Sequence, residues 1–370
     1  MNLVTYISKY LPASLRSKRF LLDQKHFDLT SFKGDVSEWM QKYPVSEENA
    51  EIHLALAELF RRRGEFDKAV AVHEAIASAN LAGYKEEELL LEMAQDYYAA
   101  GILGHAEVLL EKVLQTAGEE HSKIAFRLWL SILEREQEWG KAIALVEQFG
   151  QPGSGGIRLV NLYCEYALEL KRQGDVAQLA KVLKKARRLT LGVRASLMSA
   201  ELATAQNRLK ESIKFYRDVL IRDPLRSDIV LPALKHLSHM TKSQEALSDF
   251  LKGLYQTQPS VRILEALIEL NIDMSAHYWA AEIEHHAKQG RSKKVFDHWL
   301  DGVGSIENEA KFVIGELVHS RSLVRFDRQK CYQCGFQTDQ LIWQCPQCDG
   351  WETLYSRYEL KISRQTSKQR

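Results

Sequence analysis

A pattern of two apolar helical segments joined by a short turn recurs along most of this chain of 370 residues. In "LAELFRRRGEFDKAVAVHEAI" (56–76) and "MAQDYYAAGILGHAEVLLEKV" (93–113), an apolar segment is followed by a glycine, four residues, an alanine and a second apolar segment. Four later stretches follow the same plan, and the chain has only seven prolines to interrupt its helices. Such self-similarity predicts an array in which each helical hairpin packs mainly on its neighbours.

Two sets of positions in the repeat predict how each hairpin is built. The turn residues are 37, 36, 37, 33 and 34 residues apart, near the period of about 34 residues of tetratricopeptide repeats. Glycine or asparagine at the turn should end the first helix in a left-handed cap. Mostly small residues before and after the turn predict where the two helices cross closely. The turn residues are Gly64, Gly101, Gln137, Gly174, Asn207 and Thr241; the crossing residues are Ala57, Ala94, Leu130, Ala167, Ala200 and Leu234 in the first helices, and Ala69, Ala106, Ala142, Leu179, Ser212 and Ala246 in the second.

Degenerate repeats extend the pattern at both ends. "EWMQKYPVS" (38–46) indicates the end of a shortened first repeat, and residues 277–300 indicate one more hairpin with Gly290 at its turn. A last helix is expected over residues 308–323. The sequence therefore predicts an all-α tetratricopeptide-repeat superhelix over residues 23–323, with an irregular helical bundle as the alternative.

Such an array presents a concave face, which typically binds a peptide, a helix or another domain. First-helix positions that the hairpin contact does not use should line this groove. Their mixed charge and one tyrosine suit a polar protein partner, whereas an ordinary solvated helix face is the alternative. The expected partner-binding residues are Glu58, Arg61, Gln95, Tyr98, Arg127, Glu134, Lys171, Arg194 and Glu201.

Four of the five cysteines lie in "CYQCGFQTDQLIWQCPQC" (331–348), as two C-x-x-C pairs separated by ten residues. Each pair can form a tight turn with two thiolates directed at one ion, and Gly335 permits the left-handed backbone that such a turn needs. Four thiolates make a closed tetrahedral structural site with no open position for catalysis. One structural metal ion is therefore expected, with zinc favoured and iron as the alternative. The ligands are Cys331, Cys334, Cys345 and Cys348.

The expected metal ribbon spans residues 325–358, too few for a core of its own. We expect metal binding and folding to be coupled, with five apolar or aromatic residues covering the site. A redox dithiol or a disulfide is the alternative use of the cysteines. The covering residues are Phe336, Ile342, Trp343, Trp351 and Tyr355.

The charge and the motifs of the sequence argue against most other functional classes of protein. The formal net charge is +1, so the total charge implies neither a nucleic-acid nor a membrane partner. The tail over residues 359–370 is basic but has no dense run of lysine and arginine, so nucleic acid is not favoured. "GQPGSGGIR" (150–158) lacks the lysine of a phosphate-binding loop. Cys164 is expected to be a buried small residue. Without a catalytic constellation, we expect no enzyme and no small-molecule substrate.

Residues 1–22 form a separate N-terminal segment. Lys9 and Pro12 break its apolar stretch, so it can neither span a bilayer nor serve as a signal peptide. The chain is therefore expected to be cytoplasmic. Apolar residues at helical spacing in "LVTYISKYL" (3–11) suit a segment that lies on an anionic membrane surface, and a helix docked on the first repeat is the alternative.

Helical repeats that end in "CYQCGFQTDQLIWQCPQCDGWETL" (331–354) resemble the lipopolysaccharide assembly protein B family of Gram-negative bacteria. Its members look like tetratricopeptide repeats followed by a rubredoxin-type ribbon of the form C-x-x-C-G-F…W-x-C-P-x-C-x-x-W. The resemblance covers roughly residues 45–358, and residues 51–76 resemble the family's best-defined repeat. The ribbon pattern is occupied by Cys331, Cys334, Gly335, Phe336, Trp343, Cys345, Pro346, Cys348 and Trp351.

The resemblance implies a non-enzymatic adaptor whose ribbon packs against its repeats. Family members promote proteolysis of the deacetylase that commits acylated UDP-N-acetylglucosamine to lipid A. The degrading enzyme is a membrane-anchored AAA+ zinc protease of the inner membrane. The implied partners are this protease, the deacetylase and other lipopolysaccharide assembly proteins. A repeat scaffold for a lipopolysaccharide assembly complex and a zinc-ribbon nucleic-acid-binding protein are the alternatives.

Family members typically begin with a transmembrane helix, and residues 1–22 depart from this. Attachment to the cytoplasmic face of the inner membrane is therefore a separate expectation for this chain.

Overall fold

The computed structural model describes residues 36–81, 83, 85–150, 156–189, 192–270, 277–288, 292–302 and 329–356. The N-terminal segment 1–22, Gly290, the last expected helix at 308–323 and the tail 359–370 lie outside these residues. The chain divides into two units, Met1–Gln137 and Glu138–Arg370.

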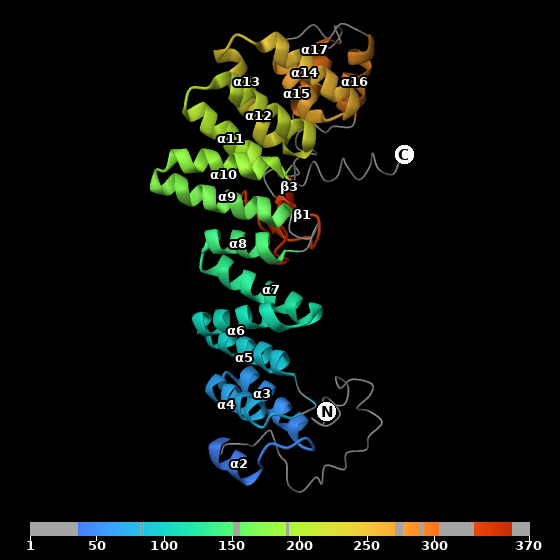
Figure 1. Cartoon of the computed structure of the whole chain (residues 1–370). Helices are drawn as coiled ribbons and strands as arrows, with labels where there is room; N and C mark the ends of the chain where they lie inside the picture. The colour runs from blue at the N-terminus through green and yellow to red at the C-terminus, as the bar shows by residue number, and fades with distance from the viewer. Residues whose placement is uncertain are drawn as a thin grey trace. The chain divides into compact units, whose positions relative to one another are not determined.

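The N-terminal unit consists of helical hairpins (Figure 1). The first helix is the end of the shortened repeat that the sequence predicts at residues 38–46. The two full hairpins are α3–α4 and α5–α6, and each helix of a pair packs along its partner. The helices are α2 (Val36–Lys42), α3 (Ala50–Arg63), α4 (Phe66–Ser78), α5 (Glu86–Ala100), α6 (Leu103–Thr116) and α7 (Glu119–Arg135).

The C-terminal unit continues the same plan and ends in the expected hairpin α16–α17 before the ribbon. A short 3-10 helix, η1 (Pro224–Arg226), precedes α13 and begins at a proline. The α-helices are α8 (Trp139–Phe149), α9 (Gly156–Gln173), α10 (Val176–Arg188), α11 (Arg194–Ala205), α12 (Leu209–Arg222), α13 (Ser227–Met240), α14 (Gln244–Thr257), α15 (Val261–Glu269), α16 (His277–Lys288) and α17 (Lys293–Gly302).

The turns between paired helices have the left-handed backbone that the sequence predicts. Gly64, Gly101 and Gly174 have φ angles of 78°, 76° and 80°. At Gly64, the next backbone N–H, that of Glu65, donates to the carbonyl of Phe60 over 2.9 Å. This bond satisfies a carbonyl at the helix end that would otherwise lack a partner. Gln137 and Asn207 also have positive φ, 59° and 57°.

The predicted crossing positions are buried in the first two hairpins and in the α9–α10 and α11–α12 hairpins. Ala57, Ala69, Ala94 and Ala106 are all 0% exposed, because a methyl group is all that fits where two helix backbones approach. Ser212 takes this position in α12, and its hydroxyl donates to the carbonyl of Ala200 over 2.8 Å. The small residues therefore set the packing distance within each hairpin.

The prediction for the sixth hairpin is wrong by one residue. Lys242, with φ 52°, is the left-handed residue, whereas Thr241 has φ −93°. Leu247 is buried and Ala246 is exposed. The loop between α13 and α14 has three residues, so the second helix starts one position later than in the two-residue loops of the first hairpins.

The ribbon is a small three-stranded antiparallel sheet in the order β2-β1-β3. Its strands are β1 (Gln329–Cys331), β2 (Gln337–Thr338) and β3 (Leu354–Ser356). Cys331 pairs with Leu354, which ties the first cysteine knuckle to the strand that follows the second. The predicted fold class, helical tetratricopeptide-type hairpins followed by a four-cysteine ribbon, is thereby confirmed.

In the described part of the chain, no helix combines the length and the apolar character that crossing a bilayer requires.

Candidate metal centre and its seat on the repeats

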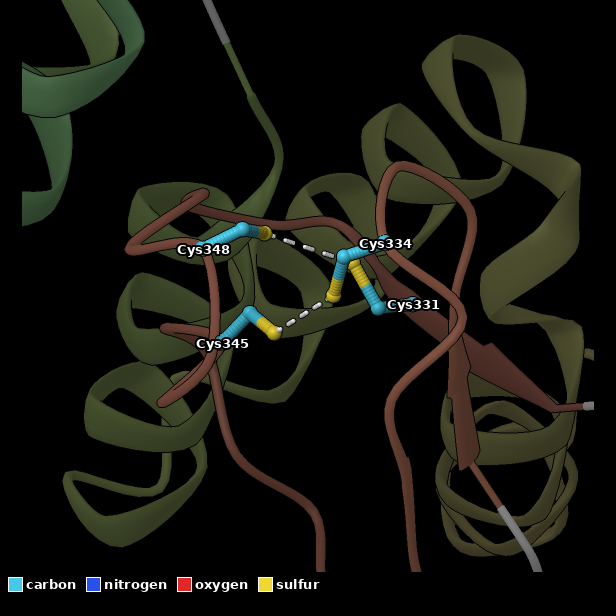
Figure 2. A group of neighbouring side chains, drawn as sticks. All are labelled: Cys331, Cys334, Cys345 and Cys348. Carbon is cyan, nitrogen blue, oxygen red and sulfur yellow. Dashed lines mark hydrogen bonds between the residues drawn. The ribbon is translucent and has the colours of Figure 1, made fainter. Parts of the chain in front are cut away.

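The four ribbon cysteines converge on one point (Figure 2). Their sulfur atoms all lie within 4.8 Å of one another. The Sγ atoms of Cys331 and Cys348 are 3.7 Å apart, and those of Cys334 and Cys345 are 3.5 Å apart. A tetrahedral ion with Zn–S bonds of about 2.3 Å holds its sulfurs about 3.8 Å apart. The residues present therefore fit a four-thiolate metal centre.

The two cysteine knuckles have the same backbone design. Gly335, directly after Cys334, has φ 85°, and its N–H donates to the Cys331 carbonyl over 3.0 Å. Asp349, directly after Cys348, has φ 53°, and its N–H donates to the Cys345 carbonyl over 2.9 Å. The sequence pointed to Gly335 but not to Asp349, because aspartate is less common than glycine in this conformation.

Backbone groups and neighbouring sulfurs shift the cysteine pKa values in opposite directions. Burial acts to raise the pKa of Cys331, but hydrogen bonds from Thr353 and from the N–H groups of Cys334 and Gln333 outweigh it and lower the pKa to about 6. The N–H of Gly350 acts to lower the pKa of Cys348, but desolvation and the other three sulfurs raise it to about 12. Four thiolates this close together need a cation to balance them, which is what a bound zinc or iron ion supplies.

Two of the four cysteines are enclosed, whereas Cys334 is exposed and Cys348 is partly buried. Cys331 and Cys345 are 0% exposed and pack with Leu354, while Phe336 and Ile342 cover them. These last two residues cover the site as expected. No other group of His, Cys, Asp and Glu suited to a metal was found in the residues that the structure describes.

The three remaining ribbon aromatics contact the repeats. Trp343 packs against the core of the C-terminal unit. Trp343 and Trp351 also lie against the guanidinium group of Arg194, and Trp343 and Tyr355 against that of Arg226. These rings therefore attach the ribbon to the helices, whereas the sequence predicts that they cover the metal site.

Glu352 is the polar centre of this contact. Its carboxylate is buried, with the residue 6% exposed. One oxygen accepts from the backbone N–H of Val193 over 2.9 Å, and the other accepts from the side-chain amide of Asn161 over 3.2 Å. Val193 is the N-cap residue of α11. A carboxylate is favoured at a helix N-terminus, where backbone N–H groups lack partners and the helix dipole is positive.

Gly192 makes room for this carboxylate. A Cβ atom on Gly192 would lie 2.2 Å from Oε1 of Glu352 and 2.5 Å from Cδ1 of Ile157. The backbone φ of Gly192 is also positive, 63°. Glycine is therefore required here twice, for the backbone conformation and for the close approach of the ribbon.

Arg226 provides a second contact that holds the ribbon on the helices. It is 2% exposed, and its guanidinium donates to the carbonyl of Leu354 over 2.8 Å. The same group lies 4.1 Å from the centre of the Tyr355 ring and forms an ion pair with Asp223 over 3.5 Å. Burying an arginine costs stability unless it is paired, and here the ribbon supplies part of the pairing.

The structure places the nine expected groove residues in different environments. Arg194 is 4% exposed and bonds to Glu165 and Asn161 beneath the ribbon, so its side chain serves the ribbon contact and is not open to another protein. Arg61 is half-buried and pairs with Glu92 and Asp96 of the next hairpin. Gln95, Tyr98 and Glu134 are partly exposed, and Glu58, Arg127, Lys171 and Glu201 are exposed.

Sequence reasoning missed Glu352, Asn161, Gly192 and Arg226. One signal was present: Asn161 interrupts the apolar run "LVNLYC" (159–164), and a buried amide needs a hydrogen-bond partner. Cys164 in the same run is 0% exposed, as expected, and burial raises the pKa of its thiol to about 12.

Comparisons with known proteins agree with both parts of the chain. Residues 330–355 match the family described as Rubredoxin metal binding domain, and residues 52–81 match Tetratricopeptide repeat. Lipopolysaccharide assembly protein B of Haemophilus influenzae is 29% identical over 321 residues, covering 82% of this chain and 78% of that protein. The Escherichia coli protein of the same name is 26% identical over 321 residues, covering 82% and 80%. In both its helical hairpins and its four-cysteine ribbon, the chain is similar to lipopolysaccharide assembly protein B.

Proposed function

We propose that this protein is a non-enzymatic adaptor that regulates lipopolysaccharide synthesis. It promotes proteolysis of the deacetylase that commits a precursor to lipid A, and the inner-membrane AAA+ protease degrades that deacetylase. The observation that carries the proposal is similarity to lipopolysaccharide assembly protein B along 82% of the chain, repeats and ribbon together. Tetratricopeptide repeats bind proteins, and a closed four-cysteine site serves structure, which suits an adaptor.

The ribbon has a positioning role in this proposal. When bound, the metal holds the two cysteine knuckles together. The chain's own residues do the rest: Glu352 and Arg226 fix the ribbon on α9, α11 and η1. The ribbon and the neighbouring helices then present one continuous surface to a partner. The exposed groove residues Lys171 of α9 and Glu201 of α11 are the proposed partner contacts on these helices.

The half-life of the deacetylase in cells depleted of this protein tests the adaptor role. We expect the half-life to lengthen several-fold, and wild-type protein to restore it. A variant with Cys331→Ser and Cys334→Ser should fail to restore it, because the ribbon loses its metal. An unchanged half-life on depletion contradicts the adaptor role and favours a scaffold for a lipopolysaccharide assembly complex. Restoration by the double variant contradicts the role assigned to the ribbon.

We also propose that the adaptor works at the cytoplasmic face of the inner membrane. The degrading protease is anchored there, and residues 1–22 combine apolar and basic residues. Fractionation of cells at low and high salt tests this. A membrane-bound pool that high salt releases is expected, since attraction to anionic lipid is screened by salt. A wholly soluble pool at low salt contradicts it.

A further inference from the structure

A cavity of about 170 Å³ lies in the N-terminal unit, between α4 and the end of α5. The residues that line it are far in sequence from the ribbon. A volume of this order accommodates a group about the size of a benzene ring. The lining residues are Phe66, Asp67, Val70, Ala71, Glu74, Tyr97, Ala100 and Ile102.

One face of α4 forms an acidic rim around an apolar floor. Asp67, Val70, Ala71 and Glu74 follow the i, i+3, i+4, i+7 spacing that places side chains on one face of a helix. Val70 and Ala71 lie between the two acids. With a rise of about 1.5 Å per residue, the acids sit about 10 Å apart along the helix axis. The cavity therefore has an apolar centre and a carboxylate at each end.

Both carboxylates are exposed, and the part of the chain that the structure describes supplies no counter-charge. Neither Asp67 nor Glu74 forms a hydrogen bond or an ion pair through its side chain with any residue that the structure describes. Many other acids of this unit are paired, as Glu58 is with Arg62 and Glu65 with Lys68. The negative charge at this cavity is therefore available to a partner.

Two further residues indicate what the cavity can accept. Ile102 is 43% exposed beside it, which leaves an apolar side chain in contact with water. Tyr97 forms part of the wall and stacks on His105. Desolvation and the negative charges of Glu74 and Asp96 raise the pKa of Tyr97.

A metal ion does not explain this arrangement. Carboxylates about 10 Å apart cannot share one ion, whose oxygen ligands lie about 2 to 2.6 Å from it. A lone small cation would leave the apolar floor and Ile102 uncovered. A chain that carries both charge and apolar surface satisfies both parts of the site.

We propose that this cavity docks a segment of a partner protein in which apolar side chains lie between two basic ones. In a polyproline II segment, which has three residues per turn and a rise of about 3.1 Å per residue, basic residues three positions apart lie on one face about 9 Å apart, close to the spacing of Asp67 and Glu74. The apolar residues between them flank that face and contact the floor at Val70 and Ala71 and the exposed Ile102. This inference does not depend on the proposed function, and its test uses the purified chain alone.

The test measures binding of the blocked peptide Ac-Gly-Arg-Leu-Leu-Arg-Gly-amide to the full-length chain with labelled isoleucine methyl groups. We expect the Ile102 methyl signal to shift on titration, with weaker binding at high salt. A peptide with citrulline in place of both arginines keeps the shape without the charge and should bind about tenfold more weakly. A peptide with serine in place of both leucines should lose affinity to a similar degree.

Protein variants locate the site. Asp67→Asn with Glu74→Gln should weaken the arginine peptide about tenfold, as expected for the loss of two exposed ion pairs. The matched control is Glu48→Gln with Glu111→Gln, which removes the same charge from exposed acids of the same unit outside the cavity. Its binding should not change.

Three results would overturn the proposal. One is an unperturbed Ile102 signal at saturating peptide. Another is equal binding of the arginine and citrulline peptides. The third is equal weakening by the cavity variant and the control variant, which would reduce the effect to overall charge.

Discussion

Gly192 and Gly174 share a left-handed backbone but differ in what surrounds them. Their φ angles are 63° and 80°. A Cβ at Gly174 meets nothing within 4 Å, whereas one at Gly192 meets the Glu352 carboxylate at 2.2 Å. The two glycines therefore separate the cost of the backbone conformation from the cost of displacing Glu352 and Ile157.

Gly174→Ala should lower the free energy of unfolding by about 1 kcal/mol, the cost of a left-handed alanine. Gly192→Ala should cost about 2 kcal/mol more, because the methyl group pushes Glu352 from its hydrogen bonds. Urea unfolding followed by tryptophan fluorescence measures both. Equal effects of the two substitutions would show that the ribbon does not press on Gly192.

Glu352→Gln keeps the size of the side chain but alters its bonding. Its carboxylate accepts two hydrogen bonds, from Val193 and Asn161, and an amide NH2 group cannot accept. The loss should be about 2 kcal/mol, the range for a buried bond to a charged group, and proteolysis should release the ribbon faster. Glu201→Gln, on an exposed acid of the same unit, should change the free energy by less than about 0.5 kcal/mol. A Glu352 variant as stable as this control would contradict the assigned contact.

At the scale of elements, Glu269 joins three helices. It lies at the end of α15 and accepts from Lys235 of α13 and Lys294 of α17. Burial acts to raise the pKa of Glu269, but the bonds and charges of the two lysines outweigh it and hold the pKa below its ordinary value.

The pH dependence follows from that sign. A carboxyl with a depressed native pKa stabilises the fold above its unfolded pKa, about 4.3, and loses that contribution as the pH falls through the native pKa. Glu269→Gln should therefore cost about 1 kcal/mol at pH 7. In thermal unfolding, the difference from wild type should shrink as the pH falls below about 4.3. A difference that stays constant with pH would mean that the charge is not responsible.

The helical hairpins show which structural features a local sequence pattern can predict. The turns at Gly64, Gly101 and Gly174 are where the sequence places them, since a left-handed cap depends on residues within one helical turn. At α13–α14, the same pattern selects Thr241, although Lys242 adopts the conformation. Neither residue is a preferred left-handed type, so the sequence alone could not decide between them.

At the scale of the whole molecule, the two units should respond differently to metal removal. A chelator should unfold the ribbon, because the metal joins its two cysteine knuckles and the ribbon has little core of its own. The Val193 amide, which donates to Glu352, should then lose protection from hydrogen exchange.

Helices α3 to α6 of the N-terminal unit should keep their protection, because their cores contain no ribbon residue. Hydrogen exchange with mass spectrometry of the full chain, with and without chelator, measures both responses. Unchanged exchange in residues 329–356 after the metal is removed would contradict the coupling of metal and ribbon.

The sequence by itself determined the helical hairpins, most of their turns and the four cysteines of the metal centre. Each of these depends on residues close along the chain: a helical period, a left-handed cap or a knuckle of a few residues. The tertiary structure alone decided how the ribbon is seated and that Arg194 lies beneath it. Those contacts join Glu352 to residues 159 and 191 positions away. Only the packed fold brings them together, because no local pattern specifies which buried charge will meet which helix end.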